Sequence, residues 1–241
     1  MNLKNKVVVV TGATGGIGRE LVKRLDIEGV TQILVSKIES ELQNQLRPLN
    51  NKNSVYFVAD LSDQDDTMKV ADKISKKYSK IDVLINAAGI GIYKPLEELS
   101  LEEWNKSMNI NLNATFIMIK ELISNLNNSS ESIVLSLGSG MGVFPEPQRS
   151  AYCTSKFALR GLMLTLAEEY KRFKKPEFCL LTLGSTLTSF GSMSFEEKKR
   201  DMENGKGYLT PEWVGQKIVE LLKLESREVE YEFSSPDYNR V

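Results

Sequence analysis

The sequence contains no histidine, and this absence restricts the chemistry open to the protein. Without an imidazole, the chain cannot form a Ser-His-Asp or Cys-His nucleophile system, a histidine-ligated zinc site or an imidazole proton shuttle. Any acid–base chemistry must therefore use Tyr, Lys, Asp, Glu or Cys side chains.

Cysteine and long apolar runs are also scarce. The two cysteines, Cys153 and Cys179, are too few for a disulfide framework or a four-cysteine metal site, so we expect free thiols and no bound metal. The apolar run at 7–10 is far too short to cross a membrane, and a Thr-Gly turn follows it. These absences predict a cytoplasmic protein in a reducing compartment, with no membrane association.

The chain also lacks an excess of either charge. Its 31 Lys and Arg residues balance 32 Asp and Glu residues, so there is no broad basic field to hold nucleic acid or an anionic membrane. The 241 residues are 41% apolar and 26% charged, which is the composition of a globular protein. Their number suits one large domain or two small ones.

Short apolar runs alternate with longer amphipathic segments along the chain. The runs are rich in Val, Ile and Leu with little polar alternation, which is typical of a parallel sheet covered by helices on both faces. We place strands at 7–11, 33–36, 55–59, 81–85, 133–137 and 178–183, and helices at 18–28, 66–78, 101–125 and 151–173. This order predicts an α/β protein with right-handed βαβ units in a doubly wound sheet, in one domain over residues 1–241.

Two segments break the alternation, at 141–149 and 189–208. Each follows a predicted strand, and ligands of open α/β sheets bind outside the carboxyl ends of the strands. We therefore expect both segments to lie beside a ligand site.

The first predicted strand runs through a glycine-rich turn, Thr-Gly-Ala-Thr-Gly-Gly-Ile-Gly at 11–18, directly into a helix. The glycines allow close approach of the backbone to a phosphate, and the helix N-terminus offers free N–H groups to a pyrophosphate. This context predicts a dinucleotide site. Gly12, Gly16 and Gly18 fit the spacing TGxxxGxG, whereas Gly12, Gly15 and Gly18 fit TGxxGxxG, so the turn alone does not select a subclass.

The end of the second strand indicates which dinucleotide binds. NAD-binding versions of this turn usually place Asp or Glu near this point to bind the ribose 2′-hydroxyl. Here Ser36 is neutral and Lys37 is cationic, which favours the 2′-phosphate of NADP(H). The alternative is that Glu39, which lies close by, points inward and that Lys37 is only a solvated surface charge. NAD(H) therefore stays open as the cofactor.

Tyr152 and Lys156 are spaced i to i+4 in a predicted helix, one turn apart on the same face. A phenol has an ordinary pKa near ~10 and is a poor acid–base group at neutral pH, but a neighbouring cation lowers that pKa. In a chain without histidine, this pair is the best candidate for proton transfer.

Further motifs accompany this pair in order along the chain. They are Asp60-Leu61 after the third strand, Asn-Ala-Ala-Gly at 86–89, Asn-Ile-Asn-Leu-Asn-Ala-Thr-Phe at 109–116, and a serine at 139, thirteen residues before Tyr152. With the glycine turn and Tyr-Cys-Thr-Ser-Lys at 152–156, this set resembles the short-chain dehydrogenase/reductase family from residue 5 to about 188. The resemblance implies a single-domain Rossmann fold with about seven strands, and hydride transfer between a nicotinamide cofactor and a carbonyl or alcohol.

The resemblance also implies catalytic roles. Tyr152 would exchange a proton with the substrate oxygen, and Lys156 would bind the nicotinamide ribose and lower the pKa of Tyr152. Ser139, with Ser136 as the alternative, would hydrogen-bond the substrate oxygen. Asn111 would bind a water that links Lys156 to solvent, at a local break in its helix.

A larger set of positions is implied to bind the cofactor. They are Gly12, Thr14, Gly15, Gly16, Ile17, Gly18, Ser36, Lys37, Asp60, Leu61, Asn86, Ala87, Ala88, Gly89, Tyr152, Lys156, Gly184 and Thr188. Two positions depart from the family pattern: Ala87 replaces the usual Asn, and Leu183 replaces the usual Pro before Gly184. The second departure leaves the geometry of the nicotinamide loop open.

We therefore expect an oxidoreductase that prefers NADP(H) and acts on the carbonyl or secondary alcohol of a small to medium substrate. The substrate would enter between the loop at 141–147 and a polar lid at 188–208, and the resemblance implies a homodimer or homotetramer. Two alternatives stay open. One is a non-catalytic module that senses NADP(H), and the other is a nucleotide-sugar epimerase or dehydratase, which the TGxxGxxG spacing permits.

Overall fold

A computed structural model of the chain describes residues 1–235. Within them, parallel strands form one sheet in the order β3-β2-β1-β4-β5-β6-β7. The strands are β1 (Val7–Thr11), β2 (Thr31–Ser36), β3 (Val55–Val58), β4 (Val83–Asn86), β5 (Ile133–Leu137), β6 (Glu177–Leu183) and β7 (Glu230–Phe233). The predicted α/β Rossmann fold with its doubly wound parallel sheet is confirmed. Residues 236–241 of the predicted domain lie outside the described residues, and the extent of that domain stays a prediction.

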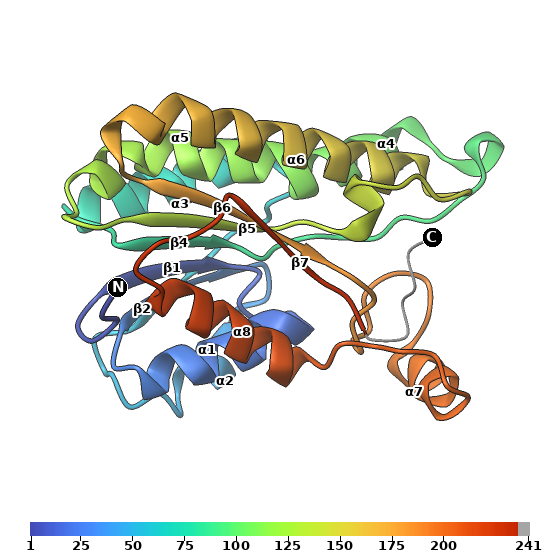
Figure 1. The fold of residues 1–241 in the computed structure, drawn as a ribbon, viewed down its shortest axis with the longest axis horizontal. Helices are drawn as coiled ribbons and strands as arrows, with labels where there is room; N and C mark the ends of the chain where they lie inside the picture. Colours follow the sequence, from blue (N-terminus) through green and yellow to red (C-terminus); the bar gives the residue numbers. More distant parts are fainter. Residues whose placement is uncertain (236–241) are drawn as a thin grey trace.

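Helices cover both faces of the sheet (Figure 1). One layer holds α1 (Gly16–Ile27), α2 (Glu39–Leu46) and α8 (Pro211–Lys223), and the other holds α3 (Gln64–Lys77), α4 (Leu101–Met108), α5 (Ala114–Asn127) and α6 (Ser150–Tyr170). The helix α7 (Phe195–Glu203) lies apart from both layers, beyond one end of the sheet. No helix within residues 1–235 has the length and apolar character needed to cross a bilayer.

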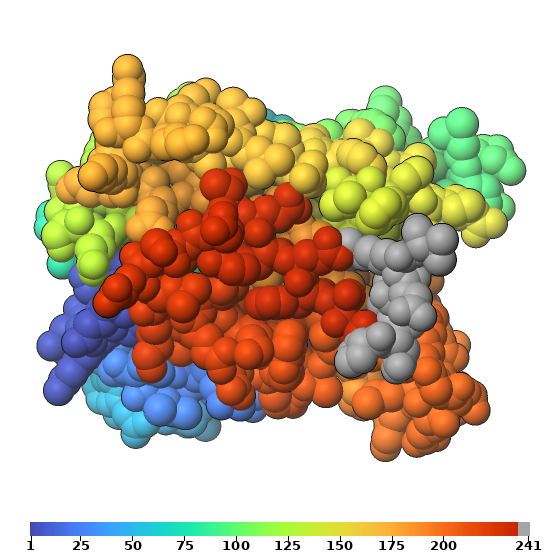
Figure 2. Space-filling view, viewed as in Figure 1, coloured from blue at the N-terminus to red at the C-terminus, as the bar shows by residue number. Residues whose placement is uncertain are grey.

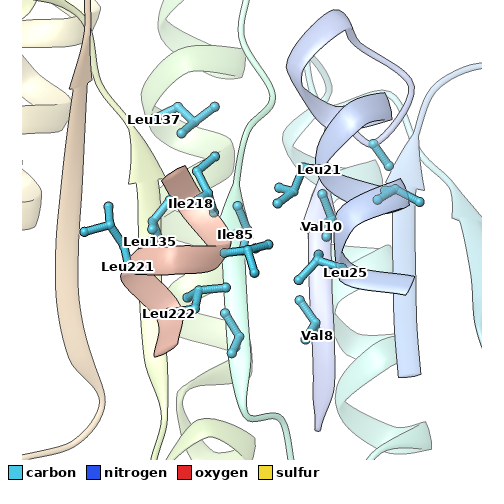
Figure 3. Close-up of a cluster of buried hydrophobic side chains, with 14 of the residues drawn as sticks. Val8, Val10, Leu21, Leu25, Ile85, Leu135, Leu137, Ile218, Leu221 and Leu222 are labelled. Atoms are coloured by element: carbon cyan, nitrogen blue, oxygen red, sulfur yellow. The ribbon is translucent and has the colours of Figure 1, made fainter. Parts of the chain in front are cut away.

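The two faces of each central strand bury their side chains in different cores. In β1, Val8 and Val10 join the core on the side of α1 and α8, whereas Val9 joins the core on the side of α3, α5 and α6. Figure 3 shows the first of these cores, where Leu21 of α1 and Ile218 of α8 pack over the sheet. Burial on both faces explains why the strand sequences show little polar alternation.

Some elements differ from the sequence-based prediction. The edge strand β7 and the helices α2 and α8 were not located from the sequence. The β7 sequence Glu-Tyr-Glu-Phe alternates polar and aromatic residues, so it lacks the continuous apolar run of the central strands. The segment at 189–208 was expected to be irregular but contains α7, which begins with a capping box formed by Ser194 and Glu197. The break expected near Asn111 is a π-helix at Asn109–Asn113 between α4 and α5.

The strand order reverses between β1 and β4, and this places a crevice at the carboxyl ends of these two strands. In the space-filling view, the segment before α4 (green), the loop before α6 (yellow) and α7 (orange) gather at that end of the molecule (Figure 2). The segments that follow β4, β5 and β6 therefore converge on one region.

Candidate active site

The glycine turn between β1 and α1 forms the floor of this region. Gly12 has a φ of +66°, and a Cβ placed on it would lie 2.7 Å from the backbone N and Cα of Ala88. Only glycine fits this combination of a left-handed backbone and close approach to the segment after β4. The helix α1 has Gly15 as its N-cap and no side-chain cap, so its first N–H groups stay available to an anion.

A cleft of about 710 Å³ extends from this turn along the carboxyl edge of the sheet. Its volume lies within the ~300–1,000 Å³ typical of small-molecule sites. The cleft is lined by Ser139 and by the following predicted cofactor positions: Gly12, Thr14, Gly15, Gly16, Ile17, Gly18, Ser36, Lys37, Asp60, Leu61, Ala87, Ala88, Gly89, Tyr152, Lys156, Gly184 and Thr188. Loops far apart in the sequence thus meet around one cavity.

Two predicted residues, Asn86 and Asn111, lie behind the cleft wall rather than on it. Asn86 is buried at the end of β4, and its amide nitrogen donates to the Ser136 hydroxyl at 3.2 Å. Its amide oxygen has no hydrogen-bond partner within residues 1–235. Asn86 therefore supports the ends of β4 and β5 from inside the protein.

Asn111 fixes the position of the segment that follows β4. Its Oδ1 accepts from the backbone N–H of Ile90 at 2.8 Å, and its Nδ2 donates to the Ile90 carbonyl oxygen at 3.0 Å. A Cβ placed on the neighbouring Gly89 would lie 3.2 Å from Asn111 Oδ1 and 3.9 Å from Lys156 Nζ. Asn111 and Lys156 therefore flank the same glycine, and the water relay between them stays a prediction.

Lys156 is buried in α6 and reaches across to the end of β5. Its Nζ donates to the Leu137 carbonyl oxygen at 2.7 Å and lies 5.9 Å from the centroid of the Tyr152 ring. Burial lowers the pKa of Lys156 to about 8. The ammonium is thus anchored near the phenol, as the i to i+4 spacing predicted.

Tyr152 is also buried, and its environment favours the protonated phenol. Burial raises the pKa of Tyr152 well above its ordinary value and Tyr93 adds to this, while a hydrogen bond with Ser139 and the charge of Arg149 lower it. The resemblance implied that Lys156 lowers this pKa, whereas in the structure burial raises it and outweighs the effects of Ser139 and Arg149. The phenol is therefore protonated at neutral pH and carries the proton that carbonyl reduction requires, although a raised pKa by itself makes it a weaker acid.

The structure also separates the two candidate serines. Ser139 follows β5 and lines the cleft, where its hydroxyl accepts from the Met141 N–H at 3.2 Å. Ser136 lies within β5, is fully buried, and donates to the sulfur of Met163 at 3.2 Å. Only Ser139 is placed to reach a ligand beside Tyr152.

Two aromatic residues enclose Tyr152 and were not identified from the sequence. The Tyr93 ring centroid lies 5.5 Å from that of Tyr152, and the Phe190 centroid lies 5.7 Å from it, both in edge-on arrangements. Gly191 has a φ of +89°, and a Cβ on it would lie 2.7 Å from the Tyr93 ring, so glycine lets the lid close on this cluster. The only signal for Tyr93 was its position after the Asn-Ala-Ala-Gly motif.

The lid that carries Phe190 is held at its base and near its tip. At the base, Leu183 stands where the family usually has proline, and the backbone there is still regular, since the Gly184 N–H donates to the Phe233 carbonyl oxygen at 2.8 Å. At the tip, the buried ammonium of Lys198 on α7 donates to the Phe190 carbonyl oxygen at 2.6 Å. Lys198 thereby fixes the segment whose ring covers Tyr152.

Replacing Lys198 by Met is expected to raise KM for the substrate about tenfold with a smaller change in kcat. The variant loses a charge-assisted hydrogen bond and leaves the Phe190 carbonyl without its donor, a cost of about 1.5–3 kcal/mol. Steady-state kinetics of the two proteins measures this. Lys199→Met, which removes an exposed neighbouring cation on α7, is the matched control, and equal KM values for both variants would contradict the anchoring role.

At the far end of the cleft, Ser36 and Lys37 lie where β2 ends. The Ser36 hydroxyl is 2.7 Å from the Thr14 hydroxyl, and Lys37 Nζ forms an ion pair with Asp60 at 2.6 Å. Although burial raises the pKa of Asp60, hydrogen bonds from Lys37 and Ser62 outweigh it and hold that pKa at about 2. The Lys37 side chain is thus exposed to solvent, and its charge is balanced by Asp60.

Arg19 is a further cation at this end that the sequence did not single out. Its Nε donates to the Thr14 carbonyl oxygen at 2.6 Å, and its guanidinium pairs with Glu41 at 3.3 Å. Two basic side chains therefore border the end of β2, each paired with a carboxylate.

Comparison with known proteins identifies the class to which this fold and site belong. Residues 6–198 match the model of a protein family that is described as short chain dehydrogenase. The chain therefore belongs to the short-chain dehydrogenase/reductase family of NAD(P)-dependent oxidoreductases.

Similar solved structures cover nearly all of the chain. An alcohol dehydrogenase from the archaeon Thermococcus sibiricus, complexed with 5-hydroxy-NADP, is 26% identical and covers 99% of both chains with a TM-score of 0.84. A putative short chain dehydrogenase from Escherichia coli CFT073, complexed with NADPH, is 26% identical over 96% of this chain and 98% of that one, with a TM-score of 0.81.

A curated relative uses the other cofactor. The NAD-dependent glycerol dehydrogenase of Listeria innocua serovar 6a is 29% identical over 169 residues, which are 70% of this chain and 66% of that relative. The chain thus spans about two thirds of that relative's length. Relatives of this protein include both NADP- and NAD-binding members.

Proposed function

We propose that this protein transfers a hydride between NADP(H) and the carbonyl or secondary alcohol of a small to medium substrate. The observation that carries the proposal is the buried, protonated phenol of Tyr152, which lies in one cleft with the Ser139 hydroxyl and the Lys156 ammonium. A phenol held in this state donates a proton to the oxygen of a carbonyl that is being reduced. The hydroxyl of Ser139 orients that oxygen, and Lys156 supplies a nearby cation.

The residues at the other end of the cleft fit a dinucleotide. Gly12 allows close backbone approach, and the uncapped N-terminus of α1 offers N–H groups to a pyrophosphate. A bound nicotinamide would supply or accept the hydride. Ser36 presents no carboxylate to a ribose 2′-hydroxyl, and Lys37 and Arg19 lie close by, which supports NADP(H) over NAD(H).

The substrate would meet this site between the loop at 141–147 and the lid at 188–208. Tyr93, Met141, Phe144, Phe190 and Met193 line this part of the cleft, so apolar and aromatic walls surround a few polar groups. We place the protein in the cytoplasm as a homodimer or homotetramer, and the exposed rings of Phe116 on α5 and Phe157 on α6 support self-association.

A carbonyl panel tests the proposed function. The protein is mixed with NADPH or NADH and a panel of aldehydes and ketones, and oxidation is followed at the nicotinamide absorbance. We expect turnover of at least one carbonyl class with a clear preference for NADPH. Tight NADPH binding without turnover of any compound would contradict the catalytic proposal and support a sensing module instead.

A further inference from the structure

Arg149 is a cation at the substrate end of the cleft for which the proposed reaction has no role. It directly precedes α6 and lines the same cavity as Tyr152. Its guanidinium carbon lies 4.6 Å from the centroid of the Tyr93 ring, which lies 5.5 Å from the centroid of the Tyr152 ring. The cation and the proton donor therefore both lie against the Tyr93 ring.

The guanidinium has no carboxylate partner within residues 1–235. One of its nitrogens donates to the sulfur of Met141 at 3.2 Å, and its central carbon lies over the Tyr93 ring. Glu146 lines the same cavity without forming an ion pair with Arg149. Because a guanidinium has five N–H donors, most of them remain available to a ligand.

The surroundings of Arg149 carry further positive charge. Apart from Lys37, the lysines that line the same cavity are Lys156, Lys198 and Lys206. The first two donate to backbone carbonyl oxygens, which leaves their charge unpaired among the described residues, whereas Lys206 pairs with Asp201 at 3.2 Å. The N-terminus of α6, which has no side-chain cap, adds the positive end of a 21-residue helix. An anionic ligand group is therefore favoured beside Tyr152.

We infer that Arg149 binds a carboxylate of the substrate, so that the preferred substrates are oxo acids or hydroxy acids with the carboxylate a few bonds from the reacting carbon. The inference rests on the proposed function, since it concerns the substrate of the same reaction. A planar guanidinium presents parallel N–H donors that match both oxygens of a carboxylate, which a lysine does not. The contacts with the Tyr93 ring and the Met141 sulfur hold the guanidinium in place before the substrate arrives.

A neutral substrate suits this site less well. When a substrate fills the cleft, it removes water from the guanidinium, and a charge that loses water without gaining a counter-charge raises the free energy of the complex. A carboxylate supplies that counter-charge and fills the free donors.

The test compares acidic ketones with neutral ketones of nearly the same shape. The probes are 3-oxobutanoate and 4-oxopentanoate, each against its methyl ester, with NADPH as the reductant. For the wild type we expect kcat/KM to be higher for at least one acid than for its ester. Arg149→Met is expected to lower that acid-to-ester ratio about 100-fold, mainly through KM for the acid. Arg149→Lys keeps the charge but not the parallel N–H donors of the guanidinium, so its acid-to-ester ratio is expected to lie between those of Arg149→Met and the wild type.

The control removes a cation at the other end of the same helix. Arg172 lies beyond the C-terminal end of α6, whose 21 residues span roughly 32 Å. The variant Arg172→Met is therefore expected to leave the acid-to-ester ratio of kcat/KM unchanged. If the acid-to-ester ratio is unchanged in Arg149→Met, whether or not both activities fall, the inference is overturned and the oxidoreductase function stays intact. Turnover of other neutral ketones but of no oxo acid would do the same. Absence of NADPH oxidation with every carbonyl would overturn the proposed function itself.

Discussion

Tyr152→Phe is expected to lower kcat for carbonyl reduction about 1,000-fold. The phenol is the group in the cleft best placed to give a proton to the substrate oxygen, and general acid catalysis contributes about 10²–10⁴-fold to a rate. The substitution removes one oxygen and keeps the ring, so the edge-on contacts with Tyr93 and Phe190 remain. The loss is measured as kcat with NADPH and a substrate found in the carbonyl panel.

NADPH affinity and the melting temperature serve as controls for this variant, and both are expected to stay near their wild-type values. The pH dependence adds a second readout in the wild type. Because the pKa of Tyr152 is raised, the phenol stays protonated at neutral pH, which is the state that carbonyl reduction requires, whereas alcohol oxidation needs the phenolate and rises with pH. A kcat within tenfold of wild type in Tyr152→Phe would rule out the phenol as the proton donor.

The parts of the site that the sequence predicted are those whose geometry is local. The glycine turn runs from a strand into a helix within eight residues, so the spacing of its glycines was enough to predict the close backbone approach at Gly12. Tyr152 and Lys156 share a helix face because helical geometry places residues four apart on the same side. The central strands were predicted because burial on both faces removes polar alternation, which the edge strand β7 retains.

The parts that the sequence did not predict depend on contacts between distant segments. Tyr93, Arg149 and Phe190 follow different strands, and they meet only because the loops after β4, β5 and β6 converge at one edge of the sheet. The direction of the Tyr152 pKa shift was predicted wrongly for the same reason. Lys156 is visible as a sequence spacing, whereas the burial that raises the pKa of Tyr152 is a property of the folded chain.

Cofactor choice depends on a smaller feature, the neutral side chain at the end of β2. Ser36 lines the cleft 2.7 Å from the Thr14 hydroxyl, at the position where NAD-binding relatives of this fold place an acidic residue. Lys37 lies beside it and is neutralised by Asp60. A new carboxylate at position 36 would therefore change the net charge at this end of the cleft from balanced to negative.

Ser36→Asp is accordingly expected to lower the NADPH-to-NADH ratio of kcat/KM about 100-fold. Two unit charges 4 Å apart interact by about 4 kcal/mol at an effective dielectric constant of 20, and screening by solvent reduces this repulsion of the 2′-phosphate. The same carboxylate accepts a hydrogen bond from the ribose 2′-hydroxyl of NADH, so part of the change is a gain for that cofactor.

The matched control for this variant is Ser40→Asp, which adds the same charge at an exposed position of α2 outside the cleft. It is expected to leave the cofactor ratio within about threefold of wild type, because an exposed charge beyond the cleft is screened. Equal ratios for Ser36→Asp and the wild type would show that Ser36 does not face the 2′-position. A wild-type preference for NADH would instead show that the ion pairs of Lys37 and Arg19 leave no cation for a 2′-phosphate.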